Sequence, residues 1–240
     1  MAALPVIEAG LRAVGRPGIP GSLPFVQHLT LWIAFLGAAL AARDGKLLAL
    51  ATGELIPEGK WRSVARIFSA AVGSAVCVLL TLASIELIGF EKEAATTVAL
   101  DVPVWVAQLA MPIGFALIGL RMVWRSSEKR WGRLLAATGL VCGLVLGLNA
   151  EWLEGSVRWP WLAILLLATV LGGPIFTILG GTAVILFMID AVPAAAVPAE
   201  TYALTISPTL AAIATPLSAR LVDSSIIGEV PFAALARDSR

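Results

Sequence analysis

The residues best suited to chemistry lie in one apolar stretch, in which paired glycines and a proline stand among hydroxyl side chains. They are Gly172, Gly173, Pro174, Thr177, Gly180, Gly181 and Thr182. Glycine and proline let backbone groups leave the helical ladder, and hydroxyl and carbonyl oxygens suit a hard cation. Transporters place such interruptions near binding sites, so we interpret the segment as a candidate substrate or ion path. Close helix packing explains the same glycines.

Three ionisable residues stand in or beside apolar stretches, where a charge is costly and usually faces protein or water. They are Glu8, His28 and Glu86. For His28 we expect a hydrogen-bonding role at the membrane interface, with proton handling as the alternative. Glu86 lies close enough to a span end to reach the interface, so we favour a structural role. His28 is the only histidine, and no catalytic motif accompanies it. We therefore predict no catalytic site, no metal site and no cofactor.

The composition predicts how these residues are held. Of the 240 residues, 59% are hydrophobic and 14% are charged, against about 45–50% and about 25% in soluble chains. Several apolar blocks reach the roughly 18 residues that cross a bilayer. The net charge of +1 gives no basic field for nucleic acid. We predict an all-α, polytopic transmembrane helix bundle in contact with membrane lipid.

The predicted bundle has about five spans plus an interfacial helix. The spans cover residues 23–42, 64–90, 102–124, 131–148 and 159–189. Residues 44–61 mix charged and apolar side chains and are expected to lie along the interface. Pro112 is expected to kink the third span, and Pro174 to break the fifth. Residues 191–213 are expected to form a loop leading into a partial helix, and the final residues to be frayed.

Lysine and arginine predict the orientation, because short cytoplasmic loops carry the excess of both. Residues 43–66 and 121–133 are rich in them, which places these segments in the cytoplasm. Residues 91–101 and 149–158 are then outside, and the segment after Asp190 is inside. Most of the eight tryptophans stand at predicted span ends, where their rings favour the headgroup region.

Two parts of the sequence resemble components of a known transporter family. GIPGSLPFVQHLTLWIAFLGAALAARDGKLLAL and VPVWVAQLAMPIGFALIGLRMVW resemble the small, DctQ-like membrane subunit of tripartite ATP-independent periplasmic (TRAP) transporters. The later stretch GGPIFTILGGTAVILFMIDAVPAAAVPAETYALTISPTLAAI resembles the start of the large, DctM-like subunit. The resemblance implies a small-subunit-like domain at 1–125, a linking span and outer loop at 126–158, and a large-subunit-like domain at 159–213. The tail at 214–240 does not match.

The resemblance also implies a function. The family imports organic acids, such as C4-dicarboxylates or sialic acid, by coupling to a sodium gradient, and it receives substrate from a periplasmic solute-binding protein. We therefore expect a scaffold component in the bacterial inner membrane, with sodium as coupling ion and the remainder of the large permease subunit as partner. The short first helix and the mismatch after Ile213 suggest a fragment or frameshifted product. The alternative is a small multi-span assembly or accessory protein without transport activity.

Overall fold

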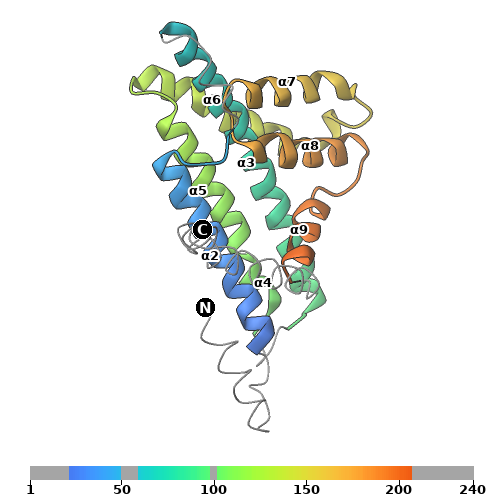
Figure 1. Cartoon of the computed structure of the whole chain (residues 1–240). Coiled ribbons are helices and arrows are strands. Elements are labelled where there is room, and N and C mark those ends of the chain that lie inside the picture. The colour runs from blue at the N-terminus through green and yellow to red at the C-terminus, as the bar shows by residue number, and fades with distance from the viewer. Residues whose placement is uncertain (1–21, 50–58, 98–101, 207–240) are drawn as a thin grey trace, which may run out of the picture. The chain divides into compact units, whose positions relative to one another are not determined.

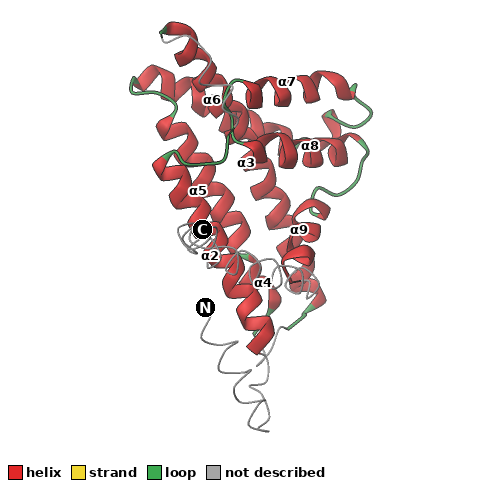
Figure 2. Ribbon diagram, viewed as in Figure 1, coloured by secondary structure: helices red, strands yellow, loops and turns green. Residues whose placement is uncertain are grey.

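The computed structural model describes residues 22–49, 59–97 and 102–206. These residues form helices joined by turns, with no strand among them (Figure 2). The chain divides into two compact units, 1–202 and 203–240, and the description below concerns the first. The all-α prediction is confirmed. The predicted domain boundaries stay predictions, and Glu8 and residues 214–240 lie outside the described residues.

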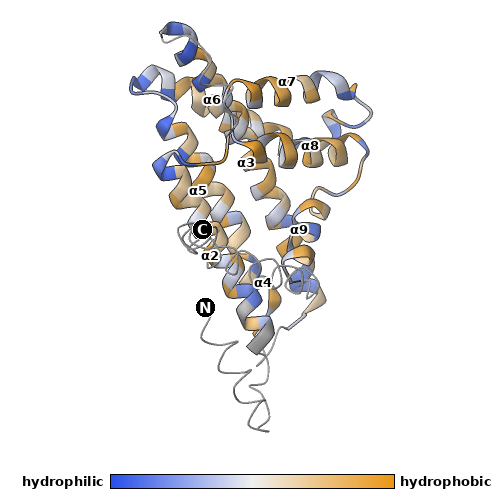
Figure 3. Ribbon diagram, in the orientation of Figure 1, coloured by the Kyte–Doolittle hydropathy of each residue, from blue (hydrophilic) through white to orange (hydrophobic). Residues whose placement is uncertain are grey.

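Four long helical segments follow the predicted spans closely. They are α2 (Ser22–Asp44), α3 (Lys60–Ala94), the pair α4 (Val104–Gln108) and α5 (Ala110–Arg125), and α6 (Arg130–Leu148). Among the described residues, three segments have the length and hydropathy to cross a bilayer: 60–94, 104–125 and 130–148. The 23 residues of α2 also have the length of a span. Hydrophobic colour dominates these helices, and hydrophilic residues gather toward their ends (Figure 3).

Helix α3 is the centre of the unit, and α5, α6, α7 (Arg158–Val170) and α8 (Ile175–Ile189) all pack against it. One core cluster joins Val76 and Leu80 of α3 to Leu165 of α7 and Val184 of α8. A second joins Cys77 of α3 to residues of α2 and α5. A helix with partners on several sides needs small buried residues, and α3 supplies serines, alanines and a glycine at such positions.

The helix between residues 104 and 125 is interrupted at Leu109. Pro112 lacks a backbone N–H, and its ring conflicts with the carbonyl of the residue four positions earlier, which is Gln108. The interruption three residues before Pro112 agrees with a disturbance by this proline, and the kink itself stays a prediction.

The prediction of an interfacial helix at 44–61 is wrong for residues 45–49, and Lys60 and Trp61 belong to the start of α3. Helix α2 ends at Asp44, Gly45 takes a φ of +70°, and residues 45–49 are not helical. The backbone N–H of Ile175 instead donates to the carbonyl of Leu48 at 2.9 Å. Residues 50–58 lie outside the described residues. This segment therefore contacts the later part of the chain.

The apolar stretch 159–189 breaks at Pro174 as predicted, but it does not continue across the membrane. Helices α7 and α8 have 13 and 15 residues, too few for the roughly 30 Å of hydrocarbon at about 1.5 Å per residue. They pack against each other as a hairpin (Figure 1). Arg158 and Asp190 form an ion pair at 2.5 Å, and the N–H of Gly155 donates to the carbonyl of Ile189 at 3.0 Å.

These contacts correct the predicted orientation. The start of α7 and the end of α8 lie together, so they cannot lie on opposite sides of a membrane as expected. The partial helix is observed as α9 (Ala196–Ile206), and its Tyr202 contacts His28 near the start of α2. The chain after Asp190 is therefore on the same side as the start of α2. The error arose because a broken span and a hairpin have the same hydropathy.

Candidate functional site

The predicted glycine-proline segment forms the turn between α7 and α8. Gly172 has a φ of +95°, a conformation that side chains rarely adopt. A β-carbon at Gly173 would lie 2.6 Å from the carbonyl oxygen of Ala168, to which the N–H of Gly173 itself donates. Pro174 then precedes the first residue of α8, a position that needs no donor within the helix. The local backbone thus favours glycine at Gly172 and Gly173 and accommodates proline at Pro174.

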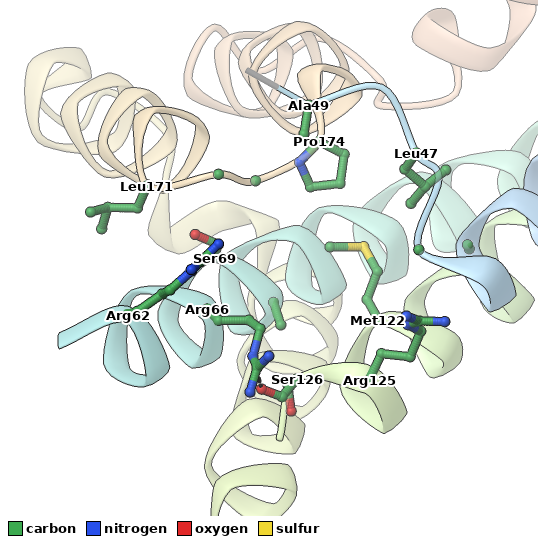
Figure 4. Close-up of a pocket in the computed structure, with 15 residues that line it drawn as sticks. Leu47, Ala49, Arg62, Arg66, Ser69, Met122, Arg125, Ser126, Leu171 and Pro174 are labelled. Carbon is green, nitrogen blue, oxygen red and sulfur yellow. Dashed lines mark hydrogen bonds between the residues drawn. The ribbon is translucent and has the colours of Figure 1, made fainter. Parts of the chain in front are cut away.

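The turn lines a cavity of about 390 Å³ together with the neighbouring ends of other helices (Figure 4). Arg62 and Arg66 come from the first turns of α3, and Arg125 comes from the end of α5. The other described lining residues are small, apolar or hydroxyl-bearing. They are Ala42, Gly45, Leu47, Ala49, Ser69, Ala70, Met122, Ser126, Leu171, Gly172, Gly173 and Pro174.

Two of these arginines stabilise helix ends. The Nε of Arg66 donates to the carbonyl oxygen of Ser126 at 2.9 Å, just after α5 (Figure 4). A terminal nitrogen of Arg125 donates to the carbonyl of Arg43 in the last turn of α2. The last carbonyls of a helix have no partner within it, and a cation there also interacts favourably with the helix dipole. The cavity is therefore cationic, and part of its charge is fixed by these bonds.

Thr177 and Thr182, both in α8, lie in different environments. Thr177 is fully buried, and its Oγ1 has no hydrogen-bond partner among the described residues. It lies beside Gly73 of α3, where a β-carbon would come within 3.2 Å of Oγ1. Thr182 is half-buried further along α8. The structure thus gives Thr177, and not Thr182, an unused buried oxygen.

Gly180 and Gly181 lie within an uninterrupted helix, so they free no backbone group. A β-carbon at Gly181 would lie 2.8 Å from side-chain carbons of Leu165 and Val76. One at Gly180 would lie 3.2 Å from Leu80. These glycines lie where α8 packs closely against α3 and α7. Their assignment to a substrate or ion path stays a prediction.

His28 has a partner on each ring nitrogen. Its Nδ1 lies 2.6 Å from the carbonyl oxygen of Pro24, and its Nε2 lies 2.5 Å from the hydroxyl of Tyr202. Because a carbonyl only accepts, Nδ1 carries a proton, and a neutral ring then accepts from Tyr202 through Nε2. Burial, and then the negative charge of Glu91, raise the pKa of Tyr202 to about 12, which keeps its hydroxyl a donor. The pair links α2 to α9.

Glu86 is exposed near the end of α3. It lines a separate cavity of about 400 Å³ that also includes Glu154 and residues from the end of α8. The third predicted ionisable residue, Glu8, lies outside the described residues. Among the described residues, no three histidine, cysteine or acidic side chains come together as metal ligands would.

The cationic cavity was not predicted from the sequence. In the sequence its arginines indicate membrane orientation, although Arg62 and Arg66 stand one helical turn apart and so share one face of α3. That spacing is the signal that could have pointed to it. No comparable pattern in the sequence links Tyr202, the only tyrosine in the chain, to His28.

A protein-family model matches the first part of the chain. The family described as "Tripartite ATP-independent periplasmic transporters, DctQ component" matches residues 1–130, slightly more than half of the chain. The matched range contains α2 to α5. No curated protein and no solved structure matches the chain.

Proposed function

Because the chain belongs to the DctQ-component family of tripartite ATP-independent periplasmic transporters, we propose that it is the scaffold part of a sodium-coupled importer of organic acids. Membership makes it a membrane component of such a transporter. We propose in addition that transport is coupled to sodium and that the substrate is a C4-dicarboxylate or a related organic acid. The family match over residues 1–130 is the observation that carries it.

We further propose that α7, α8 and α9 are the first elements of a fused, DctM-like transport domain. They follow the matched range, and the first two form a hairpin with an interrupted backbone at Gly172–Pro174. Interrupted helices supply free backbone groups at transporter binding sites. The hairpin packs on α3, which belongs to the matched range. That arrangement supports a scaffold that holds the start of a transport domain.

The proposed partners follow from this role. A periplasmic solute-binding protein would deliver the organic acid, and the remainder of the large permease subunit would supply most of the transport pathway. The proposed location is the bacterial inner membrane, where both partners can meet the chain. The cationic cavity lies at the end that the lysine and arginine pattern assigns to the cytoplasm.

Uptake by the reconstituted transporter tests the proposal. Proteoliposomes would contain this chain with the remainder of the large permease subunit, and the solute-binding protein loaded with labelled succinate would be added outside. We expect uptake that requires both a sodium gradient and this chain. Sodium-dependent uptake that is undiminished when the chain is omitted would contradict the proposal. A stable complex that is inactive towards every organic acid tested would favour the accessory-protein alternative.

Thr177 provides a sharper test of the ion path. Valine keeps the shape of threonine but lacks the hydroxyl oxygen, so Thr177→Val removes one potential sodium ligand and little else. If Oγ1 binds sodium, the sodium concentration for half-maximal uptake should rise by about tenfold, which corresponds to about 1.4 kcal/mol of binding free energy. Thr182→Val is the matched control and should leave it unchanged. An unchanged value in Thr177→Val would remove Thr177 from the ion path.

A further inference from the structure

Two tryptophans stand next to arginines of the cavity and indicate the level at which it would lie in a membrane. Trp61 immediately precedes Arg62, and Trp124 immediately precedes Arg125. Trp61 is 78% exposed and Trp124 is 61% exposed. Exposed tryptophans at the ends of membrane helices favour the interface between headgroups and acyl chains. The cavity between them therefore opens where phosphate groups are concentrated.

The lining of the cavity has two chemical parts. Three arginines from two helices line it, and none of its 15 described lining residues is acidic. Met122, Leu47 and Leu171 give the remainder an apolar character. Like charges that share a small volume repel one another, so an anion bound among them lowers the free energy. An amphiphile with an anionic head satisfies both parts of the lining.

Arg66 and Arg125 retain donors for such a ligand. A guanidinium has five N–H donors, and the bond to Ser126 uses only the Nε of Arg66. The bond from Arg125 to the carbonyl of Arg43 uses one terminal nitrogen. Guanidinium groups match phosphate oxygens with paired, charge-assisted hydrogen bonds. Because the two side chains are already held by helix ends, little side-chain entropy is lost when they bind an anion.

We propose that this cavity binds the phosphate of an anionic phospholipid, with the lipid backbone against its apolar residues. One side of the site is Arg62 and Arg66 of α3, and another is the turn from Leu171 to Pro174. The bound lipid thus joins the scaffold helix to the hairpin. Inorganic phosphate could use the arginines but would gain nothing from the apolar lining, which is why the lipid is the favoured occupant.

The experiment compares lipids that differ only in the headgroup. The full chain is reconstituted in nanodiscs of phosphatidylcholine with or without phosphatidylglycerol of the same acyl chains, and retained lipid is counted by native mass spectrometry. We expect the wild-type chain to retain phosphatidylglycerol in preference to phosphatidylcholine. The double variant Arg62→Gln, Arg66→Gln should weaken that retention at least about tenfold, as expected for lost charge-assisted bonds. If the wild-type chain retains both lipids equally, the proposal is wrong, whatever the variants show.

A matched double variant controls for general loss of basic charge. Arg121→Gln with Arg130→Gln removes two arginines of α5 and α6 that do not line the cavity. It should retain phosphatidylglycerol as the wild type does, and an equal loss in both double variants would overturn the assignment to the cavity. Inorganic phosphate added to chains in phosphatidylcholine distinguishes the sources of the anion. If it raises the thermal midpoint as much as phosphatidylglycerol does, the occupant is a free anion and the lipid proposal is wrong.

Discussion

Helix α3 packs against α6 and against the α7–α8 hairpin in two different ways. Towards α6, helix α3 presents backbone atoms at close range. A β-carbon at Gly143 would lie 2.5 Å from the carbonyl oxygen of Ala75, and a β-carbon at Gly139 would overlap the carbonyl oxygen of Ala71. Towards the hairpin the contact is made mainly by side chains, such as those of Val76 and Leu165. The same helix thus meets α6 partly through backbone atoms and meets the hairpin mainly through side chains.

The difference separates a structural interface from a candidate functional one. In a membrane the hydrophobic effect does not drive helices together, so close approach at small residues stabilises their packing. The contact between α3 and α6 follows this rule. The hairpin side instead contains the unpartnered oxygen of Thr177 and one wall of the arginine-lined cavity. Spare volume and unused polar atoms are what a binding site requires.

The largest effect should follow from a methyl group in the tighter interface. Gly139→Ala places its β-carbon against the carbonyl of Ala71, where only backbone can move. We expect a loss of about 3 kcal/mol in the free energy of unfolding, the upper part of the usual range for overpacking. Equilibrium unfolding in mixed micelles measures it.

Gly37→Ala is the control, because no atom lies within 4 Å of its β-carbon position in α2. It should stabilise the chain slightly through helix propensity. If Gly139→Ala were as well tolerated as Gly37→Ala, α3 and α6 would not be in backbone contact.

A smaller effect is expected at Gly181 in the hairpin. Its added methyl would meet the ends of the Leu165 and Val76 side chains at 2.8 Å, and these can rotate into neighbouring space. The cost should be about 1 kcal/mol, the lower end of the overpacking range. The same unfolding measurement gives the ratio between the two interfaces. A cost equal to that of Gly139→Ala would remove the distinction between them.

The long helices were predictable because span length and hydropathy are local properties. Residues 131–148 form a helix within one residue of the prediction, and Pro174 breaks the chain where expected. The direction in which the chain runs after Pro174 could not be predicted from such local properties. It depends on Arg158 meeting Asp190, a pair 32 positions apart whose contact no local pattern encodes.

The candidate site was predictable only in part. The backbone demands at Gly172, Gly173 and Pro174 follow from residue type, so the sequence located the turn. The cavity beside it required the ends of α2, α3 and α5 to meet the turn, which is a tertiary property. Arginines at span ends are also expected from membrane orientation alone. Their positions in the sequence therefore do not indicate that they share a cavity.

The smallest of the expected effects concerns a buried side-chain hydrogen bond between α3 and α7. Ser69 Oγ donates to the carbonyl oxygen of Ala168 at 2.9 Å, in a buried position beside the cavity. Ser69→Ala should cost about 0.6 kcal/mol, the average for such bonds between membrane helices. Ser84→Ala is the matched control, because Ser84 Oγ donates to Leu80 within α3 itself and its loss separates no helices.

The two serine variants should also differ in hydrogen exchange. Loss of the Ser69 bond loosens the hairpin from α3, so amides of α7 and α8 should exchange faster while those of α6 stay unchanged. Ser84→Ala should alter neither. Equal acceleration in α6 and the hairpin would mean that the two interfaces open together. They would then differ in their packing but not in their local stability.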